Sequence, residues 1–217
     1  MLYQNADSAR LGSYFHYNAC KSIRGDVAFQ GQNQCEMRLS GIRLDSIGVI
    51  GPCMNSTSSE EHELTIFRWM EIAGIGKYSY TDMSTVIPHQ QRAFWRTMLA
   101  DTRIVKGLRK RILEDNLPDI MEDIRRHIVV GTDSVINMNA KSQAISGRAF
   151  FITQKPGDEV WILFGGRVPF ILRPSKKTPS SLGAPYYTFV DECYLDGFMD
   201  GQGVDNPSYP ESGVILI

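Results

Sequence analysis

The sequence predicts an α+β protein in which amino-terminal strands and about three helices pack on a carboxyl-terminal antiparallel β-sheet or small barrel. Three observations support this fold class. Apolar residues recur at helical spacing before residue 140, they gather in short β-branched and aromatic runs after residue 149, and glycine- and proline-rich turns separate these runs. The 217 residues fit a single domain with a mostly helical half (1–140) and a β-meander half (141–217).

Before the helices, residues 36–47 predict a strand with a kink or bulge at Gly41, where the parity of the apolar residues changes. A first helix is expected to begin at a capping box formed by Ser58 and Glu61. Glycines at positions 74 and 76 are placed to end it. Its inward stripe consists of Ile66, Trp69, Met70 and Ala73.

A second helix is predicted from near Pro88, which is tolerated in a first turn, and a third over residues 119–130. The inner side of the second helix carries Phe94, Trp95, Met98 and Leu99. Between these helices, residues 106–111 form the basic cluster of the chain. This cluster could face an anionic ligand, but the neighbouring apolar and acidic residues favour a solvated face of an amphipathic helix.

Four runs in the second half predict the strands of an antiparallel meander, at residues 149–153, 159–164, 168–173 and 187–194. The last five residues, 213–217, are apolar and are hard to leave in water. We expect this tail to dock as an edge strand or in a partner, and a homo-oligomer could form through it.

Composition and charge exclude several classes of protein. The 23 basic and 24 acidic residues leave no overall field to attract nucleic acid. The amino terminus lacks the apolar core of a signal peptide and no apolar run approaches the length of a membrane span, so a cytoplasmic location without membrane contact is expected. We expect reduced, mostly buried thiols, no metal and no cofactor, because metal-ligand spacings and phosphate loops are missing. The four cysteines are Cys20, Cys35, Cys53 and Cys193.

Several runs in the second half resemble the carboxyl-terminal region of fungal heterokaryon-incompatibility (HET) proteins. That region reads as a GRxFF strand, a P-G-D turn, a hydrophobic strand into a GGxxPF(V/I)LR segment, and a closing GECYVxGxMDGE-like strand and turn. This chain carries the corresponding residues in the same order at 147–153, 156–160, 163–173 and 192–201. Weaker similarity lies at residues 17–19, 41–47 and 94–101, so the resemblance covers most of the chain.

The chain departs from this family in two places. The signalling HET domain, with its own upstream motifs, is missing, so the resemblance implies no activity that depends on that domain. Relatives also carry a glycine-rich loop before the P-G-D turn, whereas this sequence passes almost directly through Gln154 and Lys155. Either the loop is shortened, or a disordered segment is missing from this sequence.

Charged residues beside the predicted strands indicate an arginine–carboxylate network, because buried charges must be paired. We expect structural pairing here, and catalysis is the alternative. The arginines are Arg148, Arg167 and Arg173, and the carboxylates are Glu192, Asp196 and Asp200.

The candidate active or binding site is predicted between the helical half and the sheet. Its polar groups would be His16, Arg96 and Asp101, which suit proton transfer and the binding of a carboxylate or enolate. The competing account is that Arg96 and Asp101 pair along one helix while His16 packs without a catalytic role. The apolar lining would come from Tyr14 or Tyr17, Trp95 and Trp161.

Two functions are compatible with these residues. The first is a cofactor-independent small-molecule enzyme of fungal specialised metabolism: a cyclase, isomerase or lyase. The alternative is a non-catalytic interaction or scaffold module related to fungal non-self recognition. An enzyme needs the aromatic, histidine and carboxylate groups to converge in one cavity, whereas a module exposes them on one patch.

Overall fold

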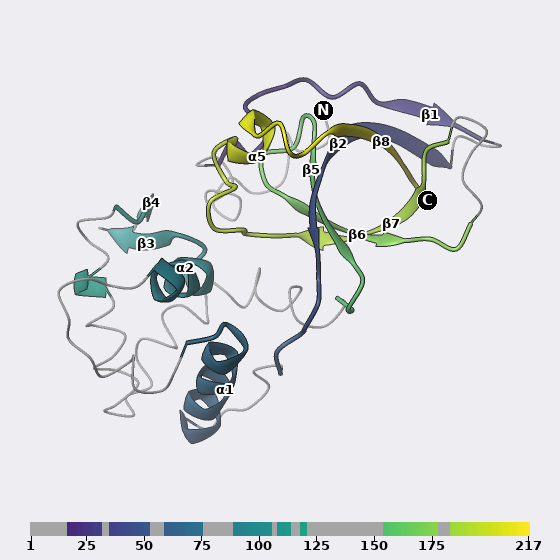
Figure 1. Ribbon diagram of the computed structural model, residues 1–217. Helices are drawn as coiled ribbons and strands as arrows, with labels where there is room; N and C mark the ends of the chain where they lie inside the picture. The colour runs from purple at the N-terminus through teal and green to yellow at the C-terminus, as the bar shows by residue number, and fades with distance from the viewer. Residues whose placement is uncertain are drawn as a thin grey trace. The chain divides into compact units, whose positions relative to one another are not determined.

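Figure 1 shows the computed structural model of the protein, which divides into two compact units. Residues 1–48 and 153–217 form the first, called here the sheet unit, and residues 49–152 form the second, the helical unit. The amino-terminal strands thus belong with the carboxyl-terminal sheet, whereas the sequence analysis grouped them with the helices. The structure describes residues 17–31, 35–52, 59–75, 89–105, 108–113, 118–120, 154–177 and 183–217.

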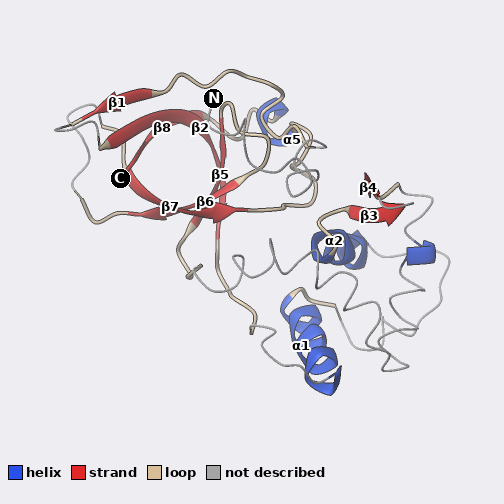
Figure 2. Ribbon diagram, turned by 180° about the vertical axis from the view of Figure 1, so that it is seen from behind, coloured by secondary structure: helices blue, strands red, loops and turns tan. Residues whose placement is uncertain are grey.

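The sheet unit contains a mixed sheet of six strands in the order β1-β2-β5-β6-β7-β8. An additional pairing joins β8 back to β2, so the pairings from β2 to β8 form a closed circuit, which Figures 1 and 2 show as a ring. The six strands are β1 (Ala28–Gln30), β2 (Glu36–Ser46), β5 (Glu159–Leu163), β6 (Phe170–Pro174), β7 (Tyr186–Glu192) and β8 (Glu211–Leu216).

The predicted meander is present as β5, β6 and β7, which pair in antiparallel fashion. The prediction of a wholly antiparallel sheet is wrong, because β7 and β8 pair in parallel. The predicted edge position of the carboxyl-terminal strand is also wrong, since β8 pairs with both β2 and β7. Burying both sides satisfies the backbone of a strand that is too apolar to leave at an edge. The predicted strand at residues 149–153 lies outside the described residues.

Strand β2 is long enough to pair with two other strands along different parts of its length. Its first half pairs with β8, its second half pairs with β5, and Gly41 and Ile42 pair on both sides. The irregularity predicted at Gly41 lies instead between Arg43 and Asp45. Gly41 serves close approach, because a Cβ atom there would stand 2.4 Å from the carbonyl oxygen of Ile162.

Side chains on alternate positions of the strands fill one face of the circuit. This cluster consists of Leu39, Trp161, Leu163, Leu172, Tyr187, Val214 and Leu216, each at most 8% exposed. The opposite face is covered as well, where Ile42 and Ile162 pack with Ala19, Cys20 and Val204 of the short helix α5 (Gln202–Asp205). Each fully buried aliphatic side chain contributes about 1.5–3 kcal/mol, so these two layers supply much of the stability of the unit.

A buried ion pair fixes the turn that leads into β5. Asp158 is 2% exposed, and its two carboxylate oxygens accept hydrogen bonds from Nε and Nη2 of Arg173, each at 2.8 Å. The backbone amide of Lys155 donates a third bond to Oδ2 at 2.8 Å. The backbone of the same turn pairs with Ile47, which donates to the Asp158 carbonyl and accepts from Gly157. The backbone of this turn therefore holds the end of β2, and its carboxylate holds β6.

The helical unit contains α1 (Ser59–Ile72) and α2 (His89–Met98), which confirm the first two predicted helices. Gly74 ends the first with a φ of +73°. Residues 118–120 are helical and lie at the start of the third predicted helix. Residues 121–130 of that prediction lie outside the described residues. The buried core of this unit consists of Ile66, Met70, Ile75 and Trp95.

The basic cluster was predicted on a helix face, and that prediction is wrong. Strands β3 (Thr102–Val105) and β4 (Leu108–Arg111) form an antiparallel two-stranded sheet. The β-branched residues of β3 favour an extended chain, and two residues separate the strands, which suits a hairpin. The helical interpretation relied on the i, i+4 spacing of Leu108 and Ile112, which a short strand followed by a buried residue also produces.

We predict that Gly41→Ala destabilises the sheet unit by about 1–3 kcal/mol, because the added methyl group would overlap the Ile162 carbonyl. Urea unfolding of the full chain measures the effect. Gly48→Ala is the control, because nothing lies within 4 Å of a Cβ atom at that position. Equal free energies of unfolding for the two variants would show that β2 and β5 can move apart to accept the methyl group without loss of stability.

We predict that Asp158→Asn lowers the free energy of unfolding by about 2–3 kcal/mol at neutral pH, since it removes hydrogen bonds between charged groups. Burial alone would raise the pKa of Asp158, but the bonds from Arg173 and from the amide of Lys155 outweigh it and lower the pKa below its usual value. The ionised carboxylate therefore stabilises the fold above its unfolded pKa, and this contribution is lost as the pH falls through the folded pKa.

The difference between wild type and Asp158→Asn should accordingly shrink as urea unfolding is repeated at decreasing pH. Asp26→Asn, at an exposed position, is the control and should show no such trend. A difference that stays constant down to the acid limit would contradict the assigned role of the charge.

Candidate functional site

A polar cluster lies at the first residue of β5, beside the aromatic core of the sheet unit. Oε2 of Glu159 accepts hydrogen bonds from the indole Nε1 of Trp161 at 3.0 Å and from the hydroxyl of Tyr187 at 2.8 Å. Its other oxygen, Oε1, lies 3.1 Å from Nε of Arg43. Residues two apart in a strand share a face, which is why Glu159 and Trp161 meet.

The environment of this cluster is partly open to solvent. The Arg43 side chain is 49% exposed, whereas the Glu159 side chain is 16% exposed and Tyr187 is buried. Burial, followed by the hydrogen bond to Glu159, raises the pKa of Tyr187 well above its usual value. The phenol therefore stays protonated at neutral pH and acts as a hydrogen-bond donor to the carboxylate. The ring of Trp161 meets the ring of Tyr187 edge to face at 5.5 Å.

The aromatic residues predicted to line the site have different surroundings. Trp161 belongs to the core of the sheet unit and Trp95 to the core of the helical unit. Tyr17 is buried with Val168 and Met199 in the sheet unit. Two further predicted residues, Tyr14 and His16, lie outside the described residues.

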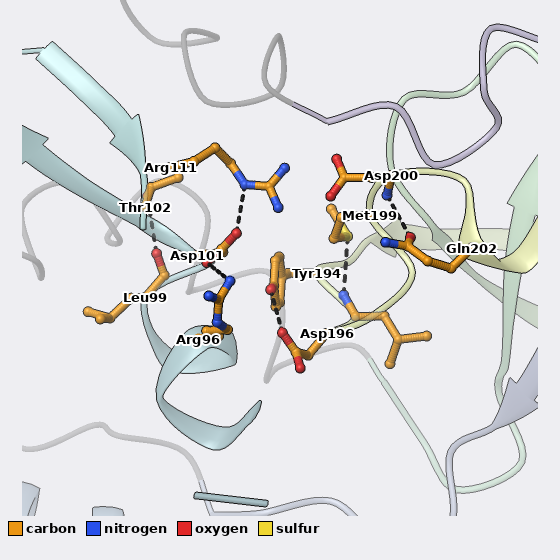
Figure 3. A network of polar contacts seen from close by, with 11 residues as sticks. Arg96, Leu99, Asp101, Thr102, Arg111, Tyr194, Asp196, Met199, Asp200 and Gln202 are labelled. Carbon is orange, nitrogen blue, oxygen red and sulfur yellow. Dashed lines mark hydrogen bonds and ion pairs between the residues drawn. The ribbon is translucent and has the colours of Figure 1, made fainter. Parts of the chain in front are cut away.

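The helical unit contains a carboxylate held by two arginines, drawn in Figure 3. Asp101 is fully buried, and its oxygens accept from Nη1 of Arg96 at 2.7 Å and from Nε of Arg111 at 2.6 Å. Ala100 and Asp101 follow α2 with φ values of +46° and +50°, a left-handed conformation that strains residues other than glycine. The strained turn places the carboxylate between the helix and the hairpin.

The pairing of Arg96 with Asp101 was the non-catalytic account given by the sequence. The pair exists, although Asp101 stands beyond the end of α2 and its backbone amide donates to the Arg96 carbonyl at 2.7 Å. Arg111 was missed, because the sequence analysis placed its segment on a helix. The β-branched residues before it were the signal for a strand and for a partner in register with Thr102.

The segment that follows β7 is rich in local contacts (Figure 3). The Tyr194 hydroxyl donates to Asp196 at 2.9 Å, and the amide of Asp200 donates to the side-chain oxygen of Gln202 at 2.9 Å. Gly197 and Gly201 have φ values of +80° and +92°, which explains the glycines of this sequence motif. These contacts shape the loop.

Among the described residues of the predicted arginine–carboxylate network, Arg173 pairs with a carboxylate outside the predicted set. Arg173 binds Asp158, a carboxylate of the P-G-D turn that the sequence analysis had counted only as turn chemistry. Arg148 lies outside the described residues. The pairing of Arg167 with the remaining predicted carboxylates, Glu192 among them, stays a prediction.

The cysteines of the described segments are free thiols, of which Cys20 and Cys193 are buried and Cys35 is exposed. Burial, with a smaller effect of Asp191 and Glu192, raises the pKa of Cys193 to about 12, so this thiol stays protonated. Within the described segments, no group of three or more His, Cys, Asp or Glu side chains is arranged to hold a metal ion. The same residues include no helix with the length and apolar character to cross a membrane.

These features define an α+β protein built on a six-stranded mixed sheet. Residues 134–208 match the family model of the Het-6 beta-barrel domain, in agreement with the resemblance to HET-related proteins. The matched segment contains β5, β6, β7 and α5, whereas β2 and β8 lie outside it. No curated protein and no solved structure matches the chain.

We predict that Asp101→Asn destabilises the protein by about 3–5 kcal/mol, because two arginines would lose the carboxylate that compensates their charge. Asp119→Asn, which changes an exposed carboxylate of the same unit, is the control and should stay within about 0.5 kcal/mol of wild type. Thermal or urea unfolding compares the variants. A stable Asp101→Asn protein would show that the triad does not support the fold.

Proposed function

We propose that the chain is a non-catalytic interaction module related to the fungal HET proteins of non-self recognition. The observation that carries this proposal is the filled face of the strand circuit. Trp161, Leu172 and Val214 belong to one core cluster and are at most 2% exposed. Side chains therefore occupy the space that a substrate would need on this face. Such a unit is a rigid platform on which surface residues can bind another protein.

The polar groups beside this core also favour a structural role. Both oxygens of Glu159 are engaged, by Arg43 on one side and by Trp161 and Tyr187 on the other. A general base must reach the proton that it removes, and a carboxylate already bonded to three donors is poorly placed to do so. The Glu159 cluster therefore orients the aromatic rings of the core.

The surface of the sheet unit offers apolar side chains for binding. Phe29 of β1 is 58% exposed and Val27, just before it, is 51% exposed. Strand β1 pairs with β2 along one edge, and no other described strand pairs with its outer edge. Exposed aromatic residues and an open strand edge are common features of surfaces that bind other proteins.

A second candidate function is the cofactor-independent cyclase, isomerase or lyase, with a polyketide- or terpene-like substrate. The observation that favours it is the exposure of Arg43 at 49% next to Glu159 and Tyr187. A guanidinium in that position could hold a carboxylate or enolate.

We predict that the chain binds a purified HET-domain protein that carries a barrel of the same family, and that Phe29→Ser weakens this binding about tenfold or more. Calorimetric titration measures the dissociation constant. Leu113→Ser is the matched control, because it removes an apolar side chain that is 63% exposed in the helical unit.

Catalytic turnover by the chain would contradict the proposal of an interaction module. Turnover of a polyketide-like ketone by the wild-type chain, lost in Arg43→Ala while the fold is retained, would favour the enzyme. Circular dichroism of each variant establishes that the fold is intact.

A further inference from the structure

Arg43 continues the core-facing row of β2 beyond the buried cluster. Leu39 belongs to that cluster, and residues two apart in a strand share a face, so Gly41 and Arg43 lie in the same row. Arg43 also pairs directly with Trp161 of the cluster. Whereas Leu39 is buried, the Arg43 side chain is 49% exposed. The row therefore ends in a guanidinium that solvent can reach.

The guanidinium of Arg43 is held at its Nε atom. Nε lies 3.1 Å from Oε1 of Glu159. In the described part of the chain, no residue accepts a hydrogen bond from the terminal nitrogens Nη1 and Nη2. These nitrogens form a planar fork of N–H groups that matches the two oxygens of a carboxylate. The exposed end of Arg43 is therefore a donor pair that a second anion can use.

Buried neighbours fix the position of this fork. Oε2 of Glu159 accepts hydrogen bonds from Trp161 at 3.0 Å and from Tyr187 at 2.8 Å, and both donors belong to the core. The carboxylate cannot turn without breaking these bonds, so it holds Nε of Arg43 in one place. A binding group that is already fixed by its neighbours loses less conformational entropy when a ligand arrives.

A serine hydroxyl lies on the same face as Arg43. Ser46 pairs directly with Glu159, which shares a face of β5 with Trp161, the partner of Arg43. The irregularity between Arg43 and Asp45 adds the extra residue that brings both side chains to one face. Ser46 is exposed, so its hydroxyl is a further donor for an anion bound by Arg43.

The acidic residues near Arg43 leave its free end available. Asp45 pairs with Val160, one position along β5 from the partner of Arg43, and therefore lies on the opposite face. Glu159 shares its charge with two neutral donors of the core as well as with the arginine. A delocalised guanidinium can bind a second carboxylate at the nitrogens that Glu159 does not occupy.

We propose that Arg43 and Ser46 bind a carboxylate on an acidic side chain of a partner protein. This inference names a contact of the proposed interaction module and rests on that function. The two terminal nitrogens of Arg43 would donate parallel hydrogen bonds to the carboxylate oxygens. The hydroxyl of Ser46 would donate to one of the same oxygens.

A protein carboxylate fits these observations better than a free acid or a nucleic acid. A small acid binds in a cavity that covers most of its surface, whereas side chains fill the core beside Arg43. Nucleic-acid binding relies on several cationic contacts and a broad positive field, which the nearly neutral chain lacks. A partner protein adds contacts elsewhere on its surface, so a single fixed arginine can serve as an anchor.

The indole signal of Trp161 in a ¹H–¹⁵N NMR spectrum of the full chain reports on this site. Its N–H donates to Glu159, the carboxylate that holds Arg43. The indoles of Trp69 and Trp95, in the helical unit, are the references. We expect a capped peptide with a central glutamate to shift the Trp161 signal in a saturable way. The same peptide with glutamine should not, because it lacks the charge.

Two substitutions test the donors. Arg43→Lys keeps the charge but removes the planar fork, and should weaken peptide binding about tenfold or more. Ser46→Ala removes one neutral hydrogen bond and should weaken it about two- to tenfold. Arg24→Lys is the matched control, because Arg24 is an exposed arginine of the same unit. The indole signals without peptide establish that each variant keeps its fold.

Three results would overturn the proposal. The first is no saturable shift with the glutamate peptide, and the second is equal affinity in wild type and Arg43→Lys. The third is acetate or inorganic phosphate that binds through Arg43 more tightly than the peptide, which would assign the site to a free acid or a phosphate.

The proposed function is tested separately by the calorimetric titration, whose readout follows Phe29. Binding of the HET-domain protein without a peptide-induced shift of Trp161 would count against the Arg43 proposal alone. A saturable shift of Trp161 without binding of that protein would count against the proposed function alone. The two failures are therefore distinguishable.

Discussion

The ion pair between Asp158 and Arg173 determines the course of the sheet. A carboxylate that is 2% exposed must be compensated, and Arg173 can reach it only when β6 runs beside the turn that opens β5. The backbone of the same turn pairs with Ile47 at the end of β2, so three strands meet at this point. Once they are fixed, β7 follows β6 in register, and β8 closes the circuit between β7 and β2.

Local patterns in the sequence predicted the elements better than their partners. The apolar stripe through Ile66 and Met70 and the runs that became β5, β6 and β7 were sufficient to place helices and strands. The partners of β8 were not predictable from its composition, because an apolar run looks the same whether one side or both sides are paired. Parallel pairing with β7 depends on contacts between segments that are distant along the chain, which periodicity does not encode.

The same limit explains the outcome for the candidate site. Pairing of Arg96 with Asp101 was the non-catalytic alternative, although a spacing of five is imperfect for a pair on one helix. The second arginine on Asp101 became visible only when β3 and β4 proved to pair as strands. Similarly, the P-G-D turn was recognisable as turn chemistry, whereas the role of its aspartate as the partner of Arg173 required the fold. Charged residues beside apolar strands indicate that pairing occurs, and the tertiary structure decides which residues pair.

Buried and exposed residues of this protein differ in what a substitution there can change. Glu159 and Asp158 are surrounded by donors, so substitutions there change the fold before they change a surface. Lys110 and Phe29 are exposed, and substitutions there should cost little stability. Because the apolar layers and the buried carboxylates together stabilise the fold, exposed residues such as Phe29 of β1 can change without loss of the core, which is what the proposed interaction module would require.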